Sequence, residues 1–412
     1  MQLSTHRLWI VSIVLAAACQ SSGKSEIVTS TKARARQDPS KTSPASTHVQ
    51  PTHEIETMVP SASPMVMETS TPESIDACST PSEYDLSALE IAFVADWDGD
   101  DEIYLVKADG NDLRQLTANE AIDVGPEWSP DGNRIAYAAG GPDNLKLYVI
   151  HPDGSGRRLL ASNWPVDGVS LSWSSQGDKI AVASENDILS VSVEDDMVTN
   201  LTADVPFSAF FPTWSPNGDK LVFLGTIARL SYAMFIVNYD GTGYKMLNSE
   251  LGEVWRPTWH PNKNKLLFTS RFEGSGEDIY LVDPEGTQLQ ALTDTGINKN
   301  DPTWSPNGEM IAYVSYIWGV SEAFDAPVLA SLHVMNADGT NDTVIVQGPK
   351  GEEFIIVSFS WAPDNRHLAY IVKYEAKEEA QEDLYVLDIC DRETVMIVED
   401  VESYTPAWNP VP

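Results

Sequence analysis

Aspartates crowd the segment Asp96-Trp97-Asp98-Gly99-Asp100-Asp101, in which four of the six residues carry a carboxylate. Carboxylates at this spacing suit a hard, oxygen-ligated cation such as Ca²⁺. The segment lacks the Glu at the twelfth position that an EF-hand loop requires, and Asp-Gly is also a common pair in tight turns. Two interpretations stand, a calcium loop and a turn; we expect the turn and predict no metal site.

The residues that could perform catalysis are scattered along the chain. His6, His48 and His53 precede the repeats described below, and the remaining four His fall in four separate repeats, at positions 151, 260, 333 and 367. The chain has no HExxH zinc motif, no G-x-S-x-G nucleophile elbow and no Cys pair with zinc-ligand spacing. We therefore expect a protein without catalytic activity and without a cofactor.

A repeated unit organises the chain beyond Glu83. Its clearest copies are PEWSPDGNRIAYAAG, PTWSPNGDKLVFLG and PTWSPNGEMIAYVS, and four weaker copies bring the total to seven. The Trp residues of the motif are spaced 41 to 57 residues apart, close to the period of a four-stranded propeller blade. Within each unit, short strands alternate with Asp-Gly or Asn-Gly pairs, which supply the positive φ of tight hairpins. The pattern predicts an all-β, seven-bladed β-propeller of four-stranded antiparallel blades at residues 83–412.

The two ends of the repeat region complement each other. The first unit begins at Leu89 with a second strand, and the last unit stops at Pro412 just after its first strand. We therefore expect the C-terminal strand around Trp408 to become the innermost strand of the first blade, which closes the ring. Cys78 and Cys390 should both lie near this closure, either as free thiols or as a disulfide.

These motifs resemble TolB-type propellers, whose repeats read close to W-S-P-D-G-x-x-I-A-F followed by D-G-x-x-E-I-Y, as in Asp98-Gly99-Asp100-Asp101-Glu102-Ile103-Tyr104. The resemblance covers about 80% of the chain and implies the propeller fold. TolB itself pairs a six-bladed propeller with an N-terminal α/β domain. Here an export signal and a linker precede a propeller that is expected to have seven blades. Similar propellers occur in prolyl-oligopeptidase-like peptidases and in some polysaccharide lyases. A carbohydrate- or peptide-active enzyme with a site in the central pocket is therefore the alternative function.

Aromatic residues and one Arg lie outside the Trp motif, in segments expected to link the strands on one face of the ring. Loops on one end of a rigid scaffold often bind ligands, and aromatic side chains with Arg are typical of binding hot spots. Packing of these loops is the competing interpretation. The candidate binding residues are Trp164, Phe210, Phe211, Trp255, Arg256, Tyr316, Trp318 and Phe324.

The N-terminus carries the pattern of an export signal. Residues 1–19 contain Arg7, an apolar run too short to span a bilayer and a final Ala-Ala-Ala-Cys. This ending resembles a bacterial lipobox and implies lipidation of Cys19; an ordinary cleaved secretory signal is the alternative. Residues 20–82 follow, with 29 Ser, Thr and Pro among 63 residues. Such a composition predicts a disordered linker.

The net charge limits the possible partners. Sixty-one acidic side chains against 26 basic ones leave a net charge of −35, which repels nucleic acids and anionic lipids. We expect an exported, lipid-anchored and monomeric protein of the bacterial cell envelope or cell surface. Its predicted function is non-enzymatic binding of an envelope protein, a peptide or a glycan through the loop face.

Overall fold

The computed structural model describes Cys78 and residues 85–411, apart from 142–143, 168–169, 229–230, 248–251, 272–275, 319–326, 349–353, 375–380 and 403. The expected signal peptide (1–19) with Cys19, and the expected linker (20–82) except Cys78, lie outside the described residues. In the part of the chain that is described, no helix has the length and apolar character needed to cross a membrane.

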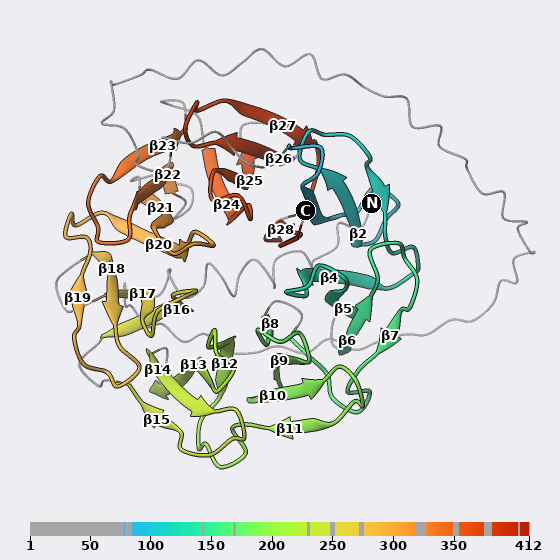
Figure 1. Ribbon diagram of the computed structural model, residues 1–412, viewed down its shortest axis with the longest axis vertical. Helices are drawn as coiled ribbons and strands as arrows, with labels where there is room; N and C mark the ends of the chain where they lie inside the picture. The colour runs from blue at the N-terminus through green and yellow to red at the C-terminus, as the bar shows by residue number, and fades with distance from the viewer. Residues whose placement is uncertain are drawn as a thin grey trace, which may run out of the picture. The chain divides into compact units, whose positions relative to one another are not determined.

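The described residues form seven antiparallel sheets of four strands each, arranged as blades around a common axis (Figure 1). The predicted seven-bladed propeller is thereby confirmed. In blades 2 to 7 the four strands follow one another in sequence from the innermost to the outermost, and only blade 1 takes a strand from the other end of the chain.

The strands occupy four equivalent positions in the blades, from the axis outward. In the order of blades 1 to 7, the innermost strands are β28 (Ala407–Trp408), β4 (Ile122–Trp128), β8 (Leu171–Trp173), β12 (Ala209–Trp214), β16 (Glu253–Trp259), β20 (Asn298–Trp304) and β24 (Phe354–Trp361). The second strands are β1 (Glu90–Ala95), β5 (Ile135–Gly141), β9 (Lys179–Ser184), β13 (Lys220–Ala228), β17 (Leu266–Arg271), β21 (Met310–Trp318) and β25 (His367–Tyr374). The third strands are β2 (Glu102–Lys107), β6 (Asn144–Ile150), β10 (Asp187–Ser192), β14 (Ser231–Asn238), β18 (Glu277–Val282), β22 (Pro327–Asn336) and β26 (Gln381–Asp388). The outermost strands are β3 (Arg114–Gln115), β7 (Arg158–Leu159), β11 (Val198–Asn200), β15 (Lys245–Met246), β19 (Gln290–Ala291), β23 (Thr343–Gln347) and β27 (Thr394–Val398).

The ring closes through the C-terminal strand, as the sequence predicted. Strand β28 pairs antiparallel with β1, with Trp408 opposite Ile91, and so supplies the innermost strand of blade 1. The amide of Asn409 extends this pairing by donating to the carbonyl oxygen of Glu90 at 2.9 Å. Because the two ends of the repeat region share one sheet, no blade edge is left open at the closure.

The core lies between neighbouring blades. The second and third strands are buried on both faces, and in six blades they pair two stacked aromatic rings, such as Tyr137 with Tyr148 in blade 2 and Tyr313 with His333 in blade 6. Sheets packed face to face need apolar side chains on both faces, which explains why these strands contain few charged residues.

The motif Trp residues link five of the seven blades to the preceding blade by a hydrogen bond. All seven are buried, with 5–8% of their surface exposed. Five indole Nε1 groups donate to the backbone carbonyl just before the Trp of the preceding blade: Trp128 to Ala407, Trp173 to Glu127, Trp259 to Thr213, Trp361 to Thr303 and Trp408 to Ser360. The indoles of Trp214 and Trp304 have no such partner among the described residues.

Candidate functional site

The innermost strands of five blades contain a β-bulge shortly before the motif Trp, and in four of these strands the bulge includes a residue with positive φ. The pairing register shifts in β4, β12, β16 and β20, and the residue three positions before each Trp has a positive φ. These residues are Gly125 (62°), Phe211 (51°), Arg256 (49°) and Asp301 (52°). A left-handed backbone is costly for a residue other than glycine, and such strain often accompanies functional sites.

The bulges of blades 4, 5 and 6 place three side chains in one row. The guanidinium of Arg256 lies over the ring of Phe211, 5.4 Å from its centroid, and its Nε lies 2.9 Å from Oδ1 of Asp301. We call these three residues the bulge row. Since both neighbours of Arg256 hold it, its partly exposed guanidinium has a fixed position on the inner strands.

A second group of side chains surrounds the bulge row. The guanidinium of Arg271 lies 5.7 Å from the ring centroid of Trp255 and forms an ion pair with Glu277. Burial raises the pKa of the Tyr316 hydroxyl, and the nearby carboxylate of Asp301 raises it further. This tyrosine therefore stays a neutral hydrogen-bonding group at physiological pH.

The structure brings part of the predicted binding set together. Phe211 contacts Arg256, and Tyr316 lies close enough to Asp301 and Arg256 for their charges to affect it. Trp255 contacts Arg271, and Phe210 packs edge-on against Tyr232 at 6.3 Å between ring centroids. Trp164 packs elsewhere, against the core between blades 2 and 3. Phe324 and the side chain of Trp318 lie outside the described residues.

The location of this set differs from the expected loops between strands. Phe210, Phe211, Trp255, Arg256, Tyr316 and Trp318 all lie within β12, β16 and β21. The expected long insertion at residues 315–331 is largely the extension of β21 and β22, with Trp318 opposite Pro327. Aromatic and β-branched residues favour strands, and a bulge lets a strand continue past an irregular residue, so the strands are longer than the motif suggested.

Three contributors were not identified from the sequence: Asp301, Arg271 and Glu277. Asp301 was recognisable, because it occupies the same repeat position as Arg256, three residues before the motif Trp. Arg271 and Glu277 end and begin consecutive strands, where a charged residue is usual, so their ion pair has no signal in the sequence.

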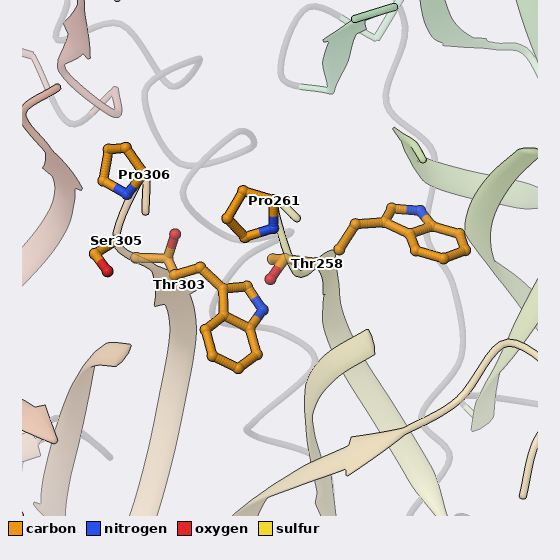
Figure 2. Close-up of a pocket in the computed structure, with 7 residues that line it drawn as sticks. Thr258, Pro261, Thr303, Ser305 and Pro306 are labelled. Atoms are coloured by element: carbon orange, nitrogen blue, oxygen red, sulfur yellow. The ribbon is translucent and has the colours of Figure 1, made fainter. Parts of the chain in front are cut away.

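A cavity of about 150 Å³ lies at the junction of blades 5 and 6 (Figure 2). Its lining consists of Thr258, Trp259, Pro261, Thr303, Trp304, Ser305 and Pro306. His260 replaces the Ser of the Trp-Ser-Pro motif here, and its ring lies 4.6 Å from that of Trp304. Nε1 of Trp304 makes no hydrogen bond among the described residues, whereas the corresponding indole of the preceding blade, Trp259, donates to the carbonyl of Thr213.

A Ser-His-Asp row occurs in blade 6, where Oγ of Ser315 lies 2.9 Å from Nε2 of His333 and Nδ1 of His333 lies 3.2 Å from Oδ1 of Asp342. The hydroxyl of Tyr313 donates to the same Asp342 at 2.6 Å. Ser315 is only 9% exposed within β21, and His333 occupies the position of a stacked aromatic ring in five other blades. These contacts are accounted for by packing of the blade.

Carboxylates also gather beside the ring closure. Ligand oxygens of Asp96, Asp101 and Glu402 lie within 4.8 Å of one another, and the nearby Trp97 is 41% exposed and donates its indole Nε1 to the carbonyl of Asp400 at 2.7 Å. The loop thus closes against the segment that leads to β28. The three carboxylate residues are half-buried, and no ion is present to show that they bind one.

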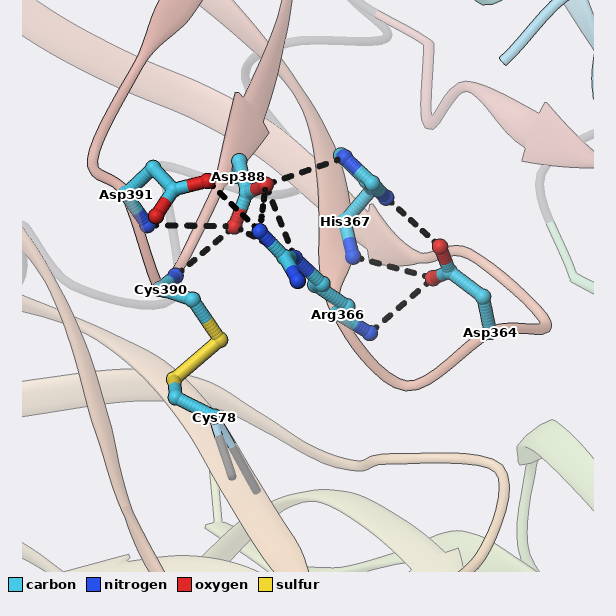
Figure 3. Close-up of a disulfide and its surroundings, with 7 residues drawn as sticks. All are labelled: Cys78, Asp364, Arg366, His367, Asp388, Cys390 and Asp391. Carbon is cyan, nitrogen blue, oxygen red and sulfur yellow. Dashed lines mark hydrogen bonds and ion pairs between the residues drawn. A yellow bond between two sulfur atoms is a disulfide. The ribbon is translucent and has the colours of Figure 1, made fainter. Parts of the chain in front are cut away.

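Cys78 and Cys390 form a disulfide, with 5.3 Å between their Cα atoms (Figure 3). The amide of Cys390 donates to Asp388, and the carboxylate of Asp388 also accepts two hydrogen bonds from Nε of Arg366. His367 lies between Asp388 and Asp364, 2.6 Å from the latter. The disulfide therefore ties the segment before β1 to a dense ionic network in blade 7.

Comparisons with known proteins support the fold. The family described as TolB beta propeller domain matches residues 77–259 and 144–323. The Tol-Pal system protein TolB of Desulfosudis oleivorans is 42% identical over 64 residues, and the TolB homolog of Chlorobium luteolum is 34% identical over 61 residues. Each match covers 15% of this chain and only 14% of the relative. The structure of oligogalacturonate lyase from Vibrio parahaemolyticus superposes with a TM-score of 0.56 and 14% identity, over 76% of this chain and 85% of that one, which shows a shared fold alone.

Proposed function

This chain belongs to the family of TolB β-propeller domains, and on that premise we propose that it is a non-enzymatic binding module of the bacterial cell envelope. The bulge row carries the proposal. Three residues with a left-handed backbone, on three consecutive blades, are held in one row by mutual contacts, and such strain often accompanies functional sites.

The chemistry of the bulge row and its surroundings favours a protein or peptide partner. Arg256, Trp255 and Tyr316 are of the three residue types most enriched in binding hot spots. Their positions on strands hold them rigidly, which lowers the entropy cost of binding. The aromatic faces would also suit a glycan, so a glycan ligand is an outcome that the experiment must distinguish.

The position in the cell is part of the same proposal. The apolar run that ends at Cys19 and the Ser-, Thr- and Pro-rich segment 20–82 support export, lipidation and a linker that lets the propeller reach a partner. The high negative charge supports a monomeric propeller that binds neither nucleic acids nor anionic lipid, with the lipid on Cys19 as its membrane contact.

The test is to crosslink the full-length protein to its neighbours on intact cells, purify it and identify the partners that are recovered with it. Trp255→Ala and Arg256→Ala should each reduce recovery of the partner at least about tenfold, as expected for hot-spot residues. Tyr239→Ala is the matched control, because Tyr239 is equally aromatic and 51% exposed on a hairpin between β14 and β15. Undiminished recovery with both variants would refute the proposal. Recovery of polysaccharide in place of protein would show that the ligand is a glycan.

A further inference from the structure

Two junctions of the propeller are equivalent in position but differ in charge. Aligning the blades on their motif Trp places Asp123 and Lys299 at the same point, five residues before Trp128 and Trp304. The residue that each one faces lies at the start of the third strand of the preceding blade: Glu102 is the first residue of β2, and Asp278 is the second residue of β18. The junction of blades 5 and 6 (junction 5/6) therefore pairs an acidic with a basic side chain, whereas the junction of blades 1 and 2 (junction 1/2) pairs two acidic side chains.

Junction 5/6 shows how the fold accommodates a cation at this point. The Nζ of Lys299 lies 2.8 Å from Oδ1 of Asp278, and these side chains are only 2% and 4% exposed. Nζ also donates to Oγ1 of Thr295 at 2.6 Å and to the carbonyl of Ile297 at 2.8 Å. The ammonium group is thus surrounded by oxygen atoms, as a bound metal ion would be.

The junction of blades 3 and 4 (junction 3/4) shows which hydrogen bonds satisfy a single buried carboxylate. Asp187, which begins the third strand of blade 3, accepts hydrogen bonds from Nδ2 of Asn200 and Oγ1 of Thr202. The position that corresponds to Lys299 is the apolar Ala209. One carboxylate is therefore satisfied by hydrogen bonds alone, and it is the second acid that distinguishes junction 1/2.

Junction 1/2 buries both carboxyl groups completely. Glu102 and Asp123 are 0% exposed and within hydrogen-bonding reach of each other. Asn119 donates its amide N–H to Glu102 at 2.6 Å and its side-chain Nδ2 to Oδ2 of Asp123 at 2.8 Å. Oδ1 of Asp123 and a buried oxygen of the neighbouring Asp100 have no hydrogen-bond partner among the described residues.

A nearby basic side chain offsets this excess of acid only in part. The charge of Arg157 lowers the pKa of Asp123, but its Nε donates to the hydroxyl of Tyr137 at 2.7 Å. Burial outweighs this effect: it raises the pKa of Asp123 and raises that of Glu102 to about 7. Two ionised carboxylates cannot share a buried site without a counter-charge, so the pair requires either a proton or a cation.

We propose that Glu102 and Asp123 bind a Ca²⁺ ion at the junction of blades 1 and 2, in the place that the ammonium group of Lys299 occupies at junction 5/6. The donor set consists of carboxylate oxygen atoms, which a hard cation prefers, and Oδ1 of Asp123 is buried without a hydrogen-bond partner among the described residues. Ca²⁺ tolerates irregular coordination better than Mg²⁺ and is abundant outside the cytoplasm, where weak sites suffice. The ion would stabilise the blade that contains the ring closure.

The experiment measures the Tm of the full-length protein in EDTA and in millimolar CaCl₂, with MgCl₂ as a second metal. The wild-type Tm should rise by about 3 °C for each tenfold excess of Ca²⁺ over its dissociation constant. Asp123→Lys reproduces the Lys299 arrangement, so this variant should lose the response to Ca²⁺ while matching or exceeding the wild-type Tm in EDTA. Glu102→Gln preserves shape and should weaken Ca²⁺ binding at least tenfold in a calorimetric titration, even if the Lys variant does not fold.

Two controls locate the ion. Asp240→Asn alters an exposed Asp-Gly turn and should respond to Ca²⁺ like the wild type. Asp96→Asn alters the surface carboxylates beside the closure, and it should also retain binding. Loss of binding in Asp96→Asn together with retention in Glu102→Gln would place the ion at the surface cluster and overturn the proposal. A wild-type Tm that is unchanged by Ca²⁺ would overturn it as well and would leave a shared proton as the state of the pair.

Discussion

At the scale of single residues, charge burial is the feature with the largest measurable consequence. His367 is 6% exposed and lies between the carboxylates of Asp364 and Asp388. Burial lowers its pKa, but the hydrogen bonds to both carboxylates outweigh burial and raise the pKa to about 9. The charged imidazole is therefore the folded-state form at neutral pH.

This shift predicts a pH dependence of stability. The folded pKa lies above the unfolded value of 6.5, so the stabilisation is complete below pH 6.5 and is lost as the pH rises through about 9. We expect the free energy of unfolding, measured by urea denaturation, to fall by roughly 3 kcal/mol across this window. His367→Gln should flatten the profile, whereas His151→Gln, at an exposed histidine, should leave it intact. An equally steep profile in His367→Gln would contradict the assignment.

At the scale of the blades, the repeated Trp has two distinct environments. Trp173 donates its indole Nε1 to the carbonyl of Glu127 at 3.0 Å, whereas Nε1 of Trp304, beside His260 and the cavity between blades 5 and 6, is buried and has no partner in the described part of the chain. The two indoles are nearly equally buried, 6% and 7% exposed. The two indoles also differ in their ring contacts, since Arg134 lies over Trp173 and His260 lies beside Trp304, and a comparison of the two measures the bond together with these contacts.

Replacing each Trp by Phe should distinguish the contribution of the indole hydrogen bond from that of the buried apolar surface. Both substitutions lose similar apolar surface, but only Trp173→Phe also leaves a buried carbonyl without its donor. We expect Trp173→Phe to lower the free energy of unfolding by about 1 kcal/mol more than Trp304→Phe does. Chemical denaturation of the two variants is the measurement. Equal losses would mean that the indole bonds between blades contribute nothing to stability.

For the whole molecule, the decisive feature is closure of the ring at two points. Strand β28 completes blade 1, and the disulfide between Cys78 and Cys390 fixes the segment before β1 to blade 7. The bond links residues 312 positions apart, so it restricts the unfolded chain over nearly the entire propeller.

Removal of the disulfide should destabilise the propeller without changing its fold. The chain-entropy account gives an upper limit of about 5 kcal/mol for a loop of this length. We expect Cys390→Ser to lower the Tm by several degrees and to have the circular dichroism spectrum of the parent. Cys78→Ser should reproduce the effect, and the double variant should add nothing further, since one bond is lost in all three. A Tm that is unaffected by reduction of the parent protein would contradict this role.

The sequence by itself determined the repeat, the number of blades and the way in which the ring closes, because Trp-Ser-Pro and Asp-Gly turns are local signals. Gly286 illustrates the point: a Cβ there would lie 1.8 Å from the carbonyl oxygen of Leu247, and its φ is 80°. Because only glycine fits such a backbone position, the requirement can be recognised in the sequence.

Only the tertiary structure decided which side chains meet. Asp301 joined Arg256 through two equivalent bulges on separate blades, and Glu102 met Asp123 across a blade junction. Both contacts depend on how sheets pack against one another, which no short stretch of sequence encodes. Trp164 and Trp255 were both candidates because each lies outside the Trp motif, yet Trp164 packs into a different blade junction. The position of a residue around the ring, and not its type, determines its neighbours.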